Sequence, residues 1–181
     1  MKTGQIEDIA KILNHTYKCH PEKCVYRDTY FDTISKDFFN SERELRLRKV
    51  IIDKAERILL TYKETPFDNA SKSKCEYEIR VSSHEEASII LGNLGYTEDI
   101  NFQKHCTNFQ VKYRSLEILV TLVSMRELKQ DFIEVEVQSD EADSINQIYE
   151  VLHEFLPLLE VASEQLTSEY YTDMVRNLRG K

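Results

Sequence analysis

Glycine is scarce in this sequence, with four glycines among 181 residues. A loop that cradles phosphate, such as the P-loop or the dinucleotide-binding fingerprint, needs several glycines at short fixed spacings, and neither pattern occurs here. Long apolar runs are missing as well: none approaches the length of a membrane span, and the first residues lack the apolar stretch of a signal peptide. We therefore expect a cytoplasmic protein without a membrane partner.

A surplus of basic residues is absent too. Lysine and arginine total 24 against 32 aspartates and glutamates, which gives a formal net charge of −8. Because nucleic-acid-binding proteins normally carry a basic surplus, we expect no nucleic-acid partner. The net charge does not exclude a local basic pocket, since a local field depends on where the charges lie.

Cysteine is also rare, and the four cysteines do not make a disulfide framework in a chain of this length without a secretion signal. His15, Cys19, His20 and Cys24 could in principle hold a zinc ion. Their spacing fits no structural zinc pattern, and no second pair follows at finger spacing. We therefore interpret these cysteines as ordinary free thiols.

The sequence is rich in short segments that carry a charge on every second residue. Because a β-strand points alternate side chains to opposite faces, each segment would have one apolar and one ionic face. The ionic faces mix arginine and lysine with glutamate, so they could bind a polyanion together with its counter-cations. The segments are residues 44–48, 57–64, 74–80 and 132–136.

The remaining pattern predicts one α+β domain over residues 1–181, dominated by antiparallel strands, with no interdomain linker. Helices are expected at residues 6–13, 84–94, 141–156 and 168–178; the second opens with a capping box at Ser83 and Glu86 and stops at Gly95. Its stripe of Ala87, Ile90, Leu91 and Leu94 should point inward. Strands are expected near residues 25–32, 44–52, 57–64, 74–82, 100–106, 109–114, 116–125 and 132–138.

The ionic faces have two interpretations. They are either the solvated side of an open sheet packed on helices, or the inside of a barrel in which opposite charges, water, metal ions or an anionic ligand must accompany them. Both topologies need the same alternation, so periodicity cannot separate them. Composition favours the barrel slightly, because the charges come in pairs such as Arg46 with Arg48 and Glu134 with Glu136.

Five short motifs follow one another along the chain: residues 28–32 (DTYFD), 44–48 (ELRLR), 60–63 (LTYK), 76–78 (EYE) and 132–136 (FIEVE). In this order they resemble the CYTH superfamily, which contains class IV adenylate cyclases, thiamine triphosphatases and related triphosphate tunnel enzymes. Two further stretches, residues 73–78 (SKCEYE) and 166–173 (LTSEYYTD), are similar to the class IV adenylate cyclase-like branch. The resemblance covers nearly the whole chain.

This resemblance implies an eight-stranded antiparallel tunnel with flanking helices that binds a triphosphate with Mg²⁺ or Mn²⁺. Basic side chains donate charge-assisted hydrogen bonds to phosphate, and hard divalent cations prefer carboxylate oxygens. The expected phosphate-binding residues are Arg46, Arg48, Lys63 and Lys104. The expected metal ligands are Glu76, Glu78, Glu134 and Glu136, and the expected catalytic residues are Lys63, Glu134 and Glu136.

Structural alternatives stay open for several of these residues. Lys104 could lie at the surface, Glu78 could pair only with Arg80, and one of Arg46 and Arg48 could face a helix. Each alternative would remove one side chain from the expected site without changing the fold.

The sequence departs from the family pattern in three places. Family members usually open with a strand carrying Glu-x-Glu-x-Lys, which is missing here, so the first strand of the tunnel is expected to be absent. Val123 stands where many relatives have an aspartate, and Cys106 where a second basic residue is frequent. Strands beside the absent one would expose unpaired backbone groups, which favour pairing with another chain, so a homodimer is one expected consequence.

The leading hypothesis is a metal-dependent, class IV adenylate cyclase-like enzyme acting on ATP, thiamine triphosphate or tripolyphosphate. As a cyclase it would let a ribose 3′-hydroxyl attack the α-phosphorus, and as a triphosphatase it would let water attack the terminal phosphorus. Both reactions depend on metal and basic residues to stabilise developing charge. The alternative hypothesis is a non-catalytic module that binds organic phosphates or polyphosphate.

Overall fold

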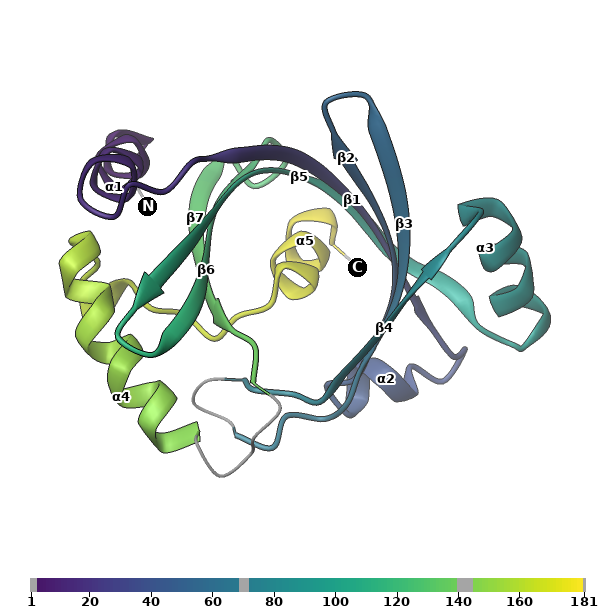
Figure 1. Cartoon of the computed structure of the whole chain (residues 1–181). Helices are drawn as coiled ribbons and strands as arrows, with labels where there is room; N and C mark the ends of the chain where they lie inside the picture. Colours follow the sequence, from purple (N-terminus) through teal and green to yellow (C-terminus); the bar gives the residue numbers. More distant parts are fainter. Residues whose placement is uncertain (1–2, 69–71, 140–144, 181) are drawn as a thin grey trace. The chain divides into compact units, whose positions relative to one another are not determined.

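The computed structural model describes residues 3–68, 72–139 and 145–180 of the chain (Figure 1). In this part of the chain, seven strands follow one another in the hydrogen-bonded order β4-β3-β2-β1-β5-β6-β7. The arrangement confirms the predicted α+β fold dominated by antiparallel strands. The elements are α1 (Thr3–His15), β1 (Glu22–Asp32), α2 (Asp37–Asn40), β2 (Glu44–Ile52), β3 (Ala55–Lys63), β4 (Glu76–Val81), α3 (His84–Asn93), β5 (Thr97–Tyr113), β6 (Leu116–Met125), β7 (Gln130–Val137), α4 (Ile145–Phe155), two 3-10 helices η2 (Leu156–Leu159) and η3 (Ser163–Gln165), and α5 (Tyr171–Arg179).

Strand β5 is the main difference from the predicted strands. The strands expected at residues 100–106 and 109–114 form one strand of 17 residues, so eight expected strands become seven in the described part of the chain. Its buried positions are even-numbered up to Cys106 and odd-numbered from Phe109. Successive side chains of a strand point to opposite faces, so a change from even to odd buried positions means that the buried face of the strand changes. The pattern therefore indicated two strands where the backbone forms one.

Helix α3 confirms its predicted ends but not its whole predicted stripe. The Ser83 hydroxyl accepts a hydrogen bond from the backbone amide of Glu86, and Gly95 has a φ of 93°, which suits the left-handed position after a helix. Ala87 and Leu91 are buried, as predicted. Ile90 and Leu94, however, are 59% and 68% exposed, because the contact with the sheet involves a narrower stripe than the apolar pattern indicated.

The last two predicted helices are present with altered bounds. The predicted start of the third helix at residues 141–144 lies outside the described residues, and α4 ends at Phe155, before Pro157. Helix α5 begins at Tyr171 and buries Val175, whereas Leu178 is exposed. None of the described helices is long and apolar enough to cross a membrane.

Residue contacts divide the chain into two compact units, each assembled from two separate segments. The first unit contains Met1–Lys23 and His105–Thr167, and the second contains Cys24–Lys104 and Ser168–Lys181. Strand β5 contributes residues to both units. The expectation of one domain over residues 1–181 stays a prediction.

In the first unit, α1 and α4 bury their apolar stripes against the C-terminal half of β5 and strand β6. The ring of Phe155 is fully buried, and its centroid lies 5.6 Å from that of Tyr17 and 5.1 Å from that of Tyr113. Together these side chains form one hydrophobic core. Its buried members are Ile9, Leu13, Cys19, Phe109, Val111, Ile118, Val120, Leu122, Phe155, Leu159 and Val161.

In the second unit, strands β1 to β4 have two chemically different faces. The apolar face packs against α2 and α3, whose Phe38, Ala87 and Leu91 join Phe31, Leu45 and Leu47 in a second core. The alternation of the strands then places arginine, lysine and carboxylate side chains on the other face. The predicted separation into an apolar and an ionic face is therefore present, and the ionic face carries the candidate site.

Candidate functional site

Strand register determines which side chains share the ionic face of the second unit. Arg48 of β2 lies opposite Asp28 of β1, while Arg46 lies opposite Tyr30 on one side and Thr61 of β3 on the other. Residues that face each other on paired strands point to the same side of the sheet. We call this side the polar face, defined by Asp28, Tyr30, Glu44, Arg46, Arg48, Thr61, Lys63, Glu76 and Glu78.

Asp28 and Arg48 form the best-defined contact of the polar face. Arg48 donates from Nε and Nη2 to the two carboxylate oxygens of Asp28, each at 2.7 Å. Asp28 is only 1% exposed. Burial alone would raise the pKa of Asp28, but the surrounding cations, chiefly Arg48, outweigh burial and lower the pKa to about 2. Asp28 is therefore ionised at neutral pH and fixes the guanidinium plane of Arg48.

Arg46 is more deeply buried than Arg48, and its polar contacts are longer. Its Nη2 lies 3.4 Å from the hydroxyl of Thr61, and its Nη1 lies 4.0 Å from a carboxylate oxygen of Asp28. Within the described residues, nothing accepts a hydrogen bond from its buried Nε. A buried donor without an acceptor costs free energy. An anion that supplied an oxygen acceptor here would recover that cost.

Lys104 of β5 brings a third cation to Asp28. Its side chain is buried, and its ammonium lies 4.7 Å from the ring centroid of Tyr171 and 5.9 Å from that of Tyr26. Its charge contributes to lowering the pKa of Asp28, which places it within electrostatic reach of that carboxylate. The alternative of a surface lysine is therefore wrong in this structure.

The centre of the polar face gathers cations in a chain whose net charge is −8. Arg46, Arg48 and Lys104 all lie within electrostatic reach of the Asp28 carboxylate, and Glu44 lies within electrostatic reach of Arg46. Buried charges of one sign repel one another, and additional negative charge reduces that cost. Both arginines lie on the same face, which excludes the alternative that one of them points to the apolar side.

Lys63 extends the polar face towards β4. Its ammonium pairs with Glu76 at 2.7 Å, and it lies between Glu76 and Glu44 in the register. Glu78 accepts a hydrogen bond from the Thr61 hydroxyl at 2.8 Å instead of pairing only with an arginine. All four predicted phosphate-binding residues, Arg46, Arg48, Lys63 and Lys104, thus belong to the second unit.

The four predicted metal ligands are divided between the two units. Glu76 and Glu78 lie on β4 in the second unit, whereas Glu134 and Glu136 lie on β7 in the first, opposite Thr121 and Leu119 of β6. Among the residues that the structure describes, no three histidine, cysteine, aspartate or glutamate side chains form a group able to hold a metal ion. Each unit offers two carboxylates of the type that Mg²⁺ and Mn²⁺ prefer. The four-glutamate metal site stays a prediction.

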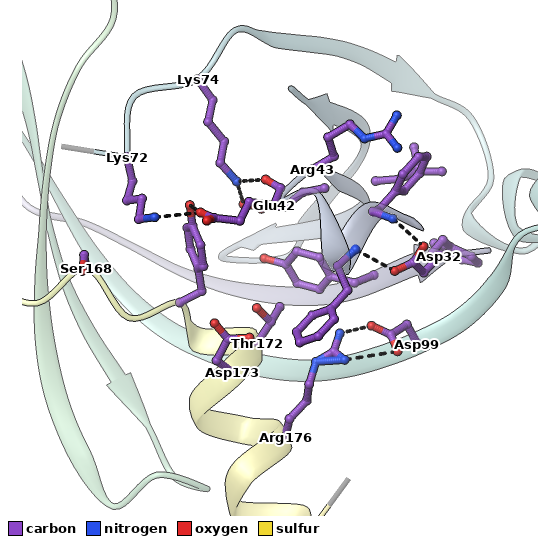
Figure 2. Close-up of a pocket in the computed structure, with 17 residues that line it drawn as sticks. Asp32, Glu42, Arg43, Lys72, Lys74, Asp99, Ser168, Thr172, Asp173 and Arg176 are labelled. Atoms are coloured by element: carbon purple, nitrogen blue, oxygen red, sulfur yellow. Dashed lines mark hydrogen bonds and ion pairs between the residues drawn. The ribbon is translucent and has the colours of Figure 1, made fainter. Parts of the chain in front are cut away.

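A cavity of about 300 Å³ opens beside the polar face within the second unit (Figure 2). It shares Tyr30 and Glu44 with that face and is lined on another side by Tyr170 and α5. Lys74 donates to Glu44 and to the backbone carbonyl oxygen of Glu42, both at 2.6 Å. The cavity therefore contains additional cations and carboxylates next to the three central cations.

Helix α5 is anchored at this cavity by Asp99 of β5. The carboxylate of Asp99 pairs with Arg176 of α5 and, at 2.5 Å, with Lys36 (Figure 2 draws the first pair). The Arg176 guanidinium also lies 4.5 Å from the ring centroid of Phe39. Burial raises the pKa of Asp173 on the same helix, partly offset by Arg176. The same helix places Tyr171 over Lys104.

Sequence reasoning missed Asp28, Lys74 and Arg176 as site residues. Asp28 and Lys74 belong to motifs that carried the family resemblance, but their roles depend on cross-strand register, which no single segment reveals. Arg176 lies in a helix whose apolar stripe alone was recognised. The alternation of charge was a usable signal for Asp28, because a buried arginine pair needs a counter-charge on a neighbouring strand.

Comparisons with known proteins agree with this architecture. A Methanocaldococcus jannaschii protein named "Putative adenylate cyclase" is 24% identical over 173 residues, which cover 94% of each chain. Among solved structures, the PH1819 protein of Pyrococcus horikoshii superposes with a TM-score of 0.80 at 23% identity, over 94% of this chain and 93% of that one. The Hippeastrum protein HpAC1, described as having a dominant triphosphatase activity, superposes with a TM-score of 0.71 at 12% identity, over 98% and 91%.

The sequence model of one family covers nearly the whole chain. Residues 3–171 match the CYTH domain, and this stretch includes every strand of the polar face and the start of α5. The resemblance recognised in the motifs is thereby confirmed, and the chain belongs to the CYTH domain family.

Proposed function

We propose that this chain is a metal-dependent enzyme that binds ATP or another organic or inorganic triphosphate on the polar face. One observation carries the proposal: Arg46 and Lys104 are buried close to Asp28 and Arg48, and the buried Nε of Arg46 has no hydrogen-bond acceptor among the described residues. A phosphate chain supplies both negative charge and several hydrogen-bond acceptors. The family membership, and the triphosphatase activity described for the Hippeastrum relative, support the same ligand class.

The residues of the polar face have distinct roles in this proposal. Arg46 would donate its free Nε to a phosphate oxygen, while Arg48, oriented by Asp28, would add its positive charge. Lys63 would exchange Glu76 for a second phosphate group, which costs little because that ion pair is partly exposed. Lys104 would add charge from β5.

The carboxylates that would hold Mg²⁺ or Mn²⁺ are Glu76 and Glu78 in the second unit and Glu134 and Glu136 in the first. A bound ion would neutralise phosphate charge and polarise a phosphoryl oxygen. Freeing Glu76 from Lys63 makes its carboxylate available for this purpose. The protein's own part is to position the phosphate chain so that an attacking oxygen and the leaving group lie in line. If a substrate hydroxyl attacks the α-phosphorus, the enzyme is a cyclase. If water attacks the terminal phosphorus, it is a triphosphatase.

Binding is tested by calorimetric titration of tripolyphosphate and of ATP, each with and without Mn²⁺, into the parent and into Arg46→Gln. The matched control is Arg27→Gln, because Arg27 is an exposed arginine on β1 that pairs with Gln103 outside the polar face. We expect Arg46→Gln to weaken binding at least tenfold and Arg27→Gln to leave it unchanged. Equal affinities in all three proteins would exclude the polar face as the phosphate site.

A second function, a phosphate-binding module without catalysis, is favoured by one observation. Glu76 and Glu78 are already engaged by Lys63 and Thr61, which leaves them poorly available as metal ligands unless the ligand displaces those contacts. Product analysis separates the two functions: release of phosphate or pyrophosphate with Mn²⁺ supports the enzyme. Tight binding with no product from ATP, thiamine triphosphate or tripolyphosphate supports the module.

A further inference from the structure

We propose that two copies of this chain pair through strand β4 of the second unit, in antiparallel orientation about Ile79. Strand β4 stands at one end of the strand order, and in the described part of the chain only β3 is hydrogen-bonded to it. The outer edge of such a strand presents backbone N–H and C=O groups that another strand can use. A second copy supplies a strand of identical sequence, and a two-fold axis makes the contact closed and symmetric.

The sequence of β4 is complementary to itself in one register. Pairing centred on Ile79 places Glu78 opposite Arg80 twice and Tyr77 opposite Val81 twice, with Ile79 opposite itself. Opposite charges and aromatic–β-branched pairs that face each other across antiparallel strands stabilise a sheet. The two ion pairs form on the polar side and the apolar pairs on the other side.

Neighbouring registers are less complementary. Pairing centred on Glu78 places Glu76 opposite Arg80 twice, but it also places Glu78 opposite its own copy. Pairing centred on Arg80 places that arginine opposite its own copy. Like charges directly opposite each other are destabilising. A shift of one residue would turn the apolar side chains of one copy to the polar side of the other. The register centred on Ile79 is therefore favoured, because it forms two ion pairs and places no like charges opposite each other.

The apolar side chains of β4 are exposed in the single chain. Tyr77 is 59% exposed and Ile79 is 60% exposed, whereas Leu47 of the interior strand β2 is fully buried. The ring of Tyr77 stacks on Tyr62 with centroids 6.5 Å apart, and Tyr62 in turn contacts Phe38 of the second core. A second β4 placed alongside would continue this apolar surface across the two-fold axis.

A strand from an unrelated protein would also satisfy the backbone of β4, but it would match Glu78 and Arg80 only by coincidence. A second copy satisfies both charges through sequence identity alone. Arg80 is exposed, and Glu78 has one carboxylate oxygen beyond the one that accepts from Thr61. The pairing thus requires no existing hydrogen bond of the polar face to break.

The first experiment is sedimentation velocity of the full chain over a range of concentrations. We expect a monomer–dimer equilibrium in the parent and a monomer in Ile79→Lys, because two lysines would meet at the two-fold axis. The matched control is Ile89→Lys: Ile89 is 56% exposed and lies on α3, on the side of the helix away from Ala87 and Leu91. A parent that stays monomeric, or a dimer that survives Ile79→Lys, overturns the proposal.

A charge exchange tests the register. Glu78→Arg and Arg80→Glu should each be monomeric alone, since like charges would face each other, and should form a one-to-one heterodimer when mixed. The double variant Glu78→Arg with Arg80→Glu should again form a homodimer. Circular dichroism of each variant checks that it folds. Folded single variants that remain monomers when mixed would overturn pairing about Ile79.

Discussion

Arg48 of β2 donates a hydrogen bond to each oxygen of the buried Asp28 carboxylate on the neighbouring strand β1, both at 2.7 Å. This relationship explains how a protein of net charge −8 can hold three cations together inside one unit. Asp28 orients the guanidinium of Arg48, while the buried Nε of Arg46 has no hydrogen-bond acceptor among the described residues. An anion bound on the polar face would supply that acceptor.

Replacing Asp28 with asparagine should lower the free energy of unfolding by about 3–5 kcal/mol, because Arg48 loses the charge of the carboxylate that binds it and the buried Arg46 loses a nearby anion. Tripolyphosphate should restore part of this loss, since it provides the missing negative charge. The measurement is urea unfolding with and without tripolyphosphate, compared with the exposed Asp8→Asn variant of α1. A ligand that stabilises Asp28→Asn less than it stabilises the parent contradicts the argument.

The Asp28 carboxylate should also give the protein a specific pH dependence. Its folded-state pKa is about 2 against an ordinary value of 3.8, so its contribution is complete above pH 3.8 and is lost as the pH falls towards 2. The contribution amounts to roughly 2 kcal/mol. The difference in unfolding free energy between the parent and Asp28→Asn should therefore shrink between about pH 4 and pH 2. A difference that stays constant over this range would show that Asp28 does not titrate with the lowered pKa.

Lys63 should contribute to binding more than to stability. Its ion pair with Glu76 is partly exposed, and pairs of that kind contribute about 0–1 kcal/mol to folding. Lys63→Met should weaken tripolyphosphate binding several-fold while changing the melting temperature little. Lys49→Met is the matched control, because Lys49 lies on β2, points away from the polar face and pairs with Glu56 at 3.2 Å. Equal losses of affinity in both variants would mean that only the overall charge matters.

The polar face shows how far the sequence alone could predict this site. Alternation of charge with apolar residues specified which side of each strand is ionic, and it selected Arg46, Arg48 and Lys63 correctly as residues of one face. Side chains alternate between the two faces of any β-strand, so this separation does not depend on how the strands are arranged in the sheet. The partner of each charge was not predictable, because register joins residues far apart in the chain, such as Asp28 with Arg48.

Strand β5 shows where local reasoning fails. Its buried positions change from even to odd numbers after Cys106, which looks like the end of one strand and the start of another. The backbone continues because the strand serves two units in succession. Only tertiary contacts distinguish a strand that changes partners from two strands joined by a turn. The exposure of Ile90 in α3 and of Leu94 directly after it has a similar explanation, because tertiary packing determines how much of a helix's apolar stripe is buried.

Glu134→Gln and Glu136→Gln should weaken the response to Mn²⁺ more than they weaken folding. A carboxamide keeps the size of the side chain but loses the charge that holds a divalent cation. The measurement is the Mn²⁺ dependence of tripolyphosphate binding, with Glu117→Gln on β6 as an exposed control from the same unit. Variants that respond to Mn²⁺ like the parent would remove both glutamates from the metal site and leave the phosphate-binding residues in place.

Asp99→Asn should loosen helix α5 while the rest of the second unit keeps its fold. The carboxylate of Asp99 is buried and binds Arg176 of α5 together with Lys36, so the amide variant leaves a largely buried guanidinium without its anion. We expect the free energy of unfolding to fall by about 2–3 kcal/mol, which is below the usual cost of breaking a fully buried pair because Lys36 is partly exposed.

Hydrogen exchange should accelerate at Tyr171–Arg179 and stay unchanged at Glu44–Ile52 of β2. Since Tyr171 lies over Lys104 at 4.7 Å, the loosened helix should also make Lys104 more reactive towards an amine-modifying reagent. If α5 exchanges at the parent rate in Asp99→Asn, its position over Lys104 depends on Val175 and the ring contact of Tyr171 with Phe102 instead of the ion pair.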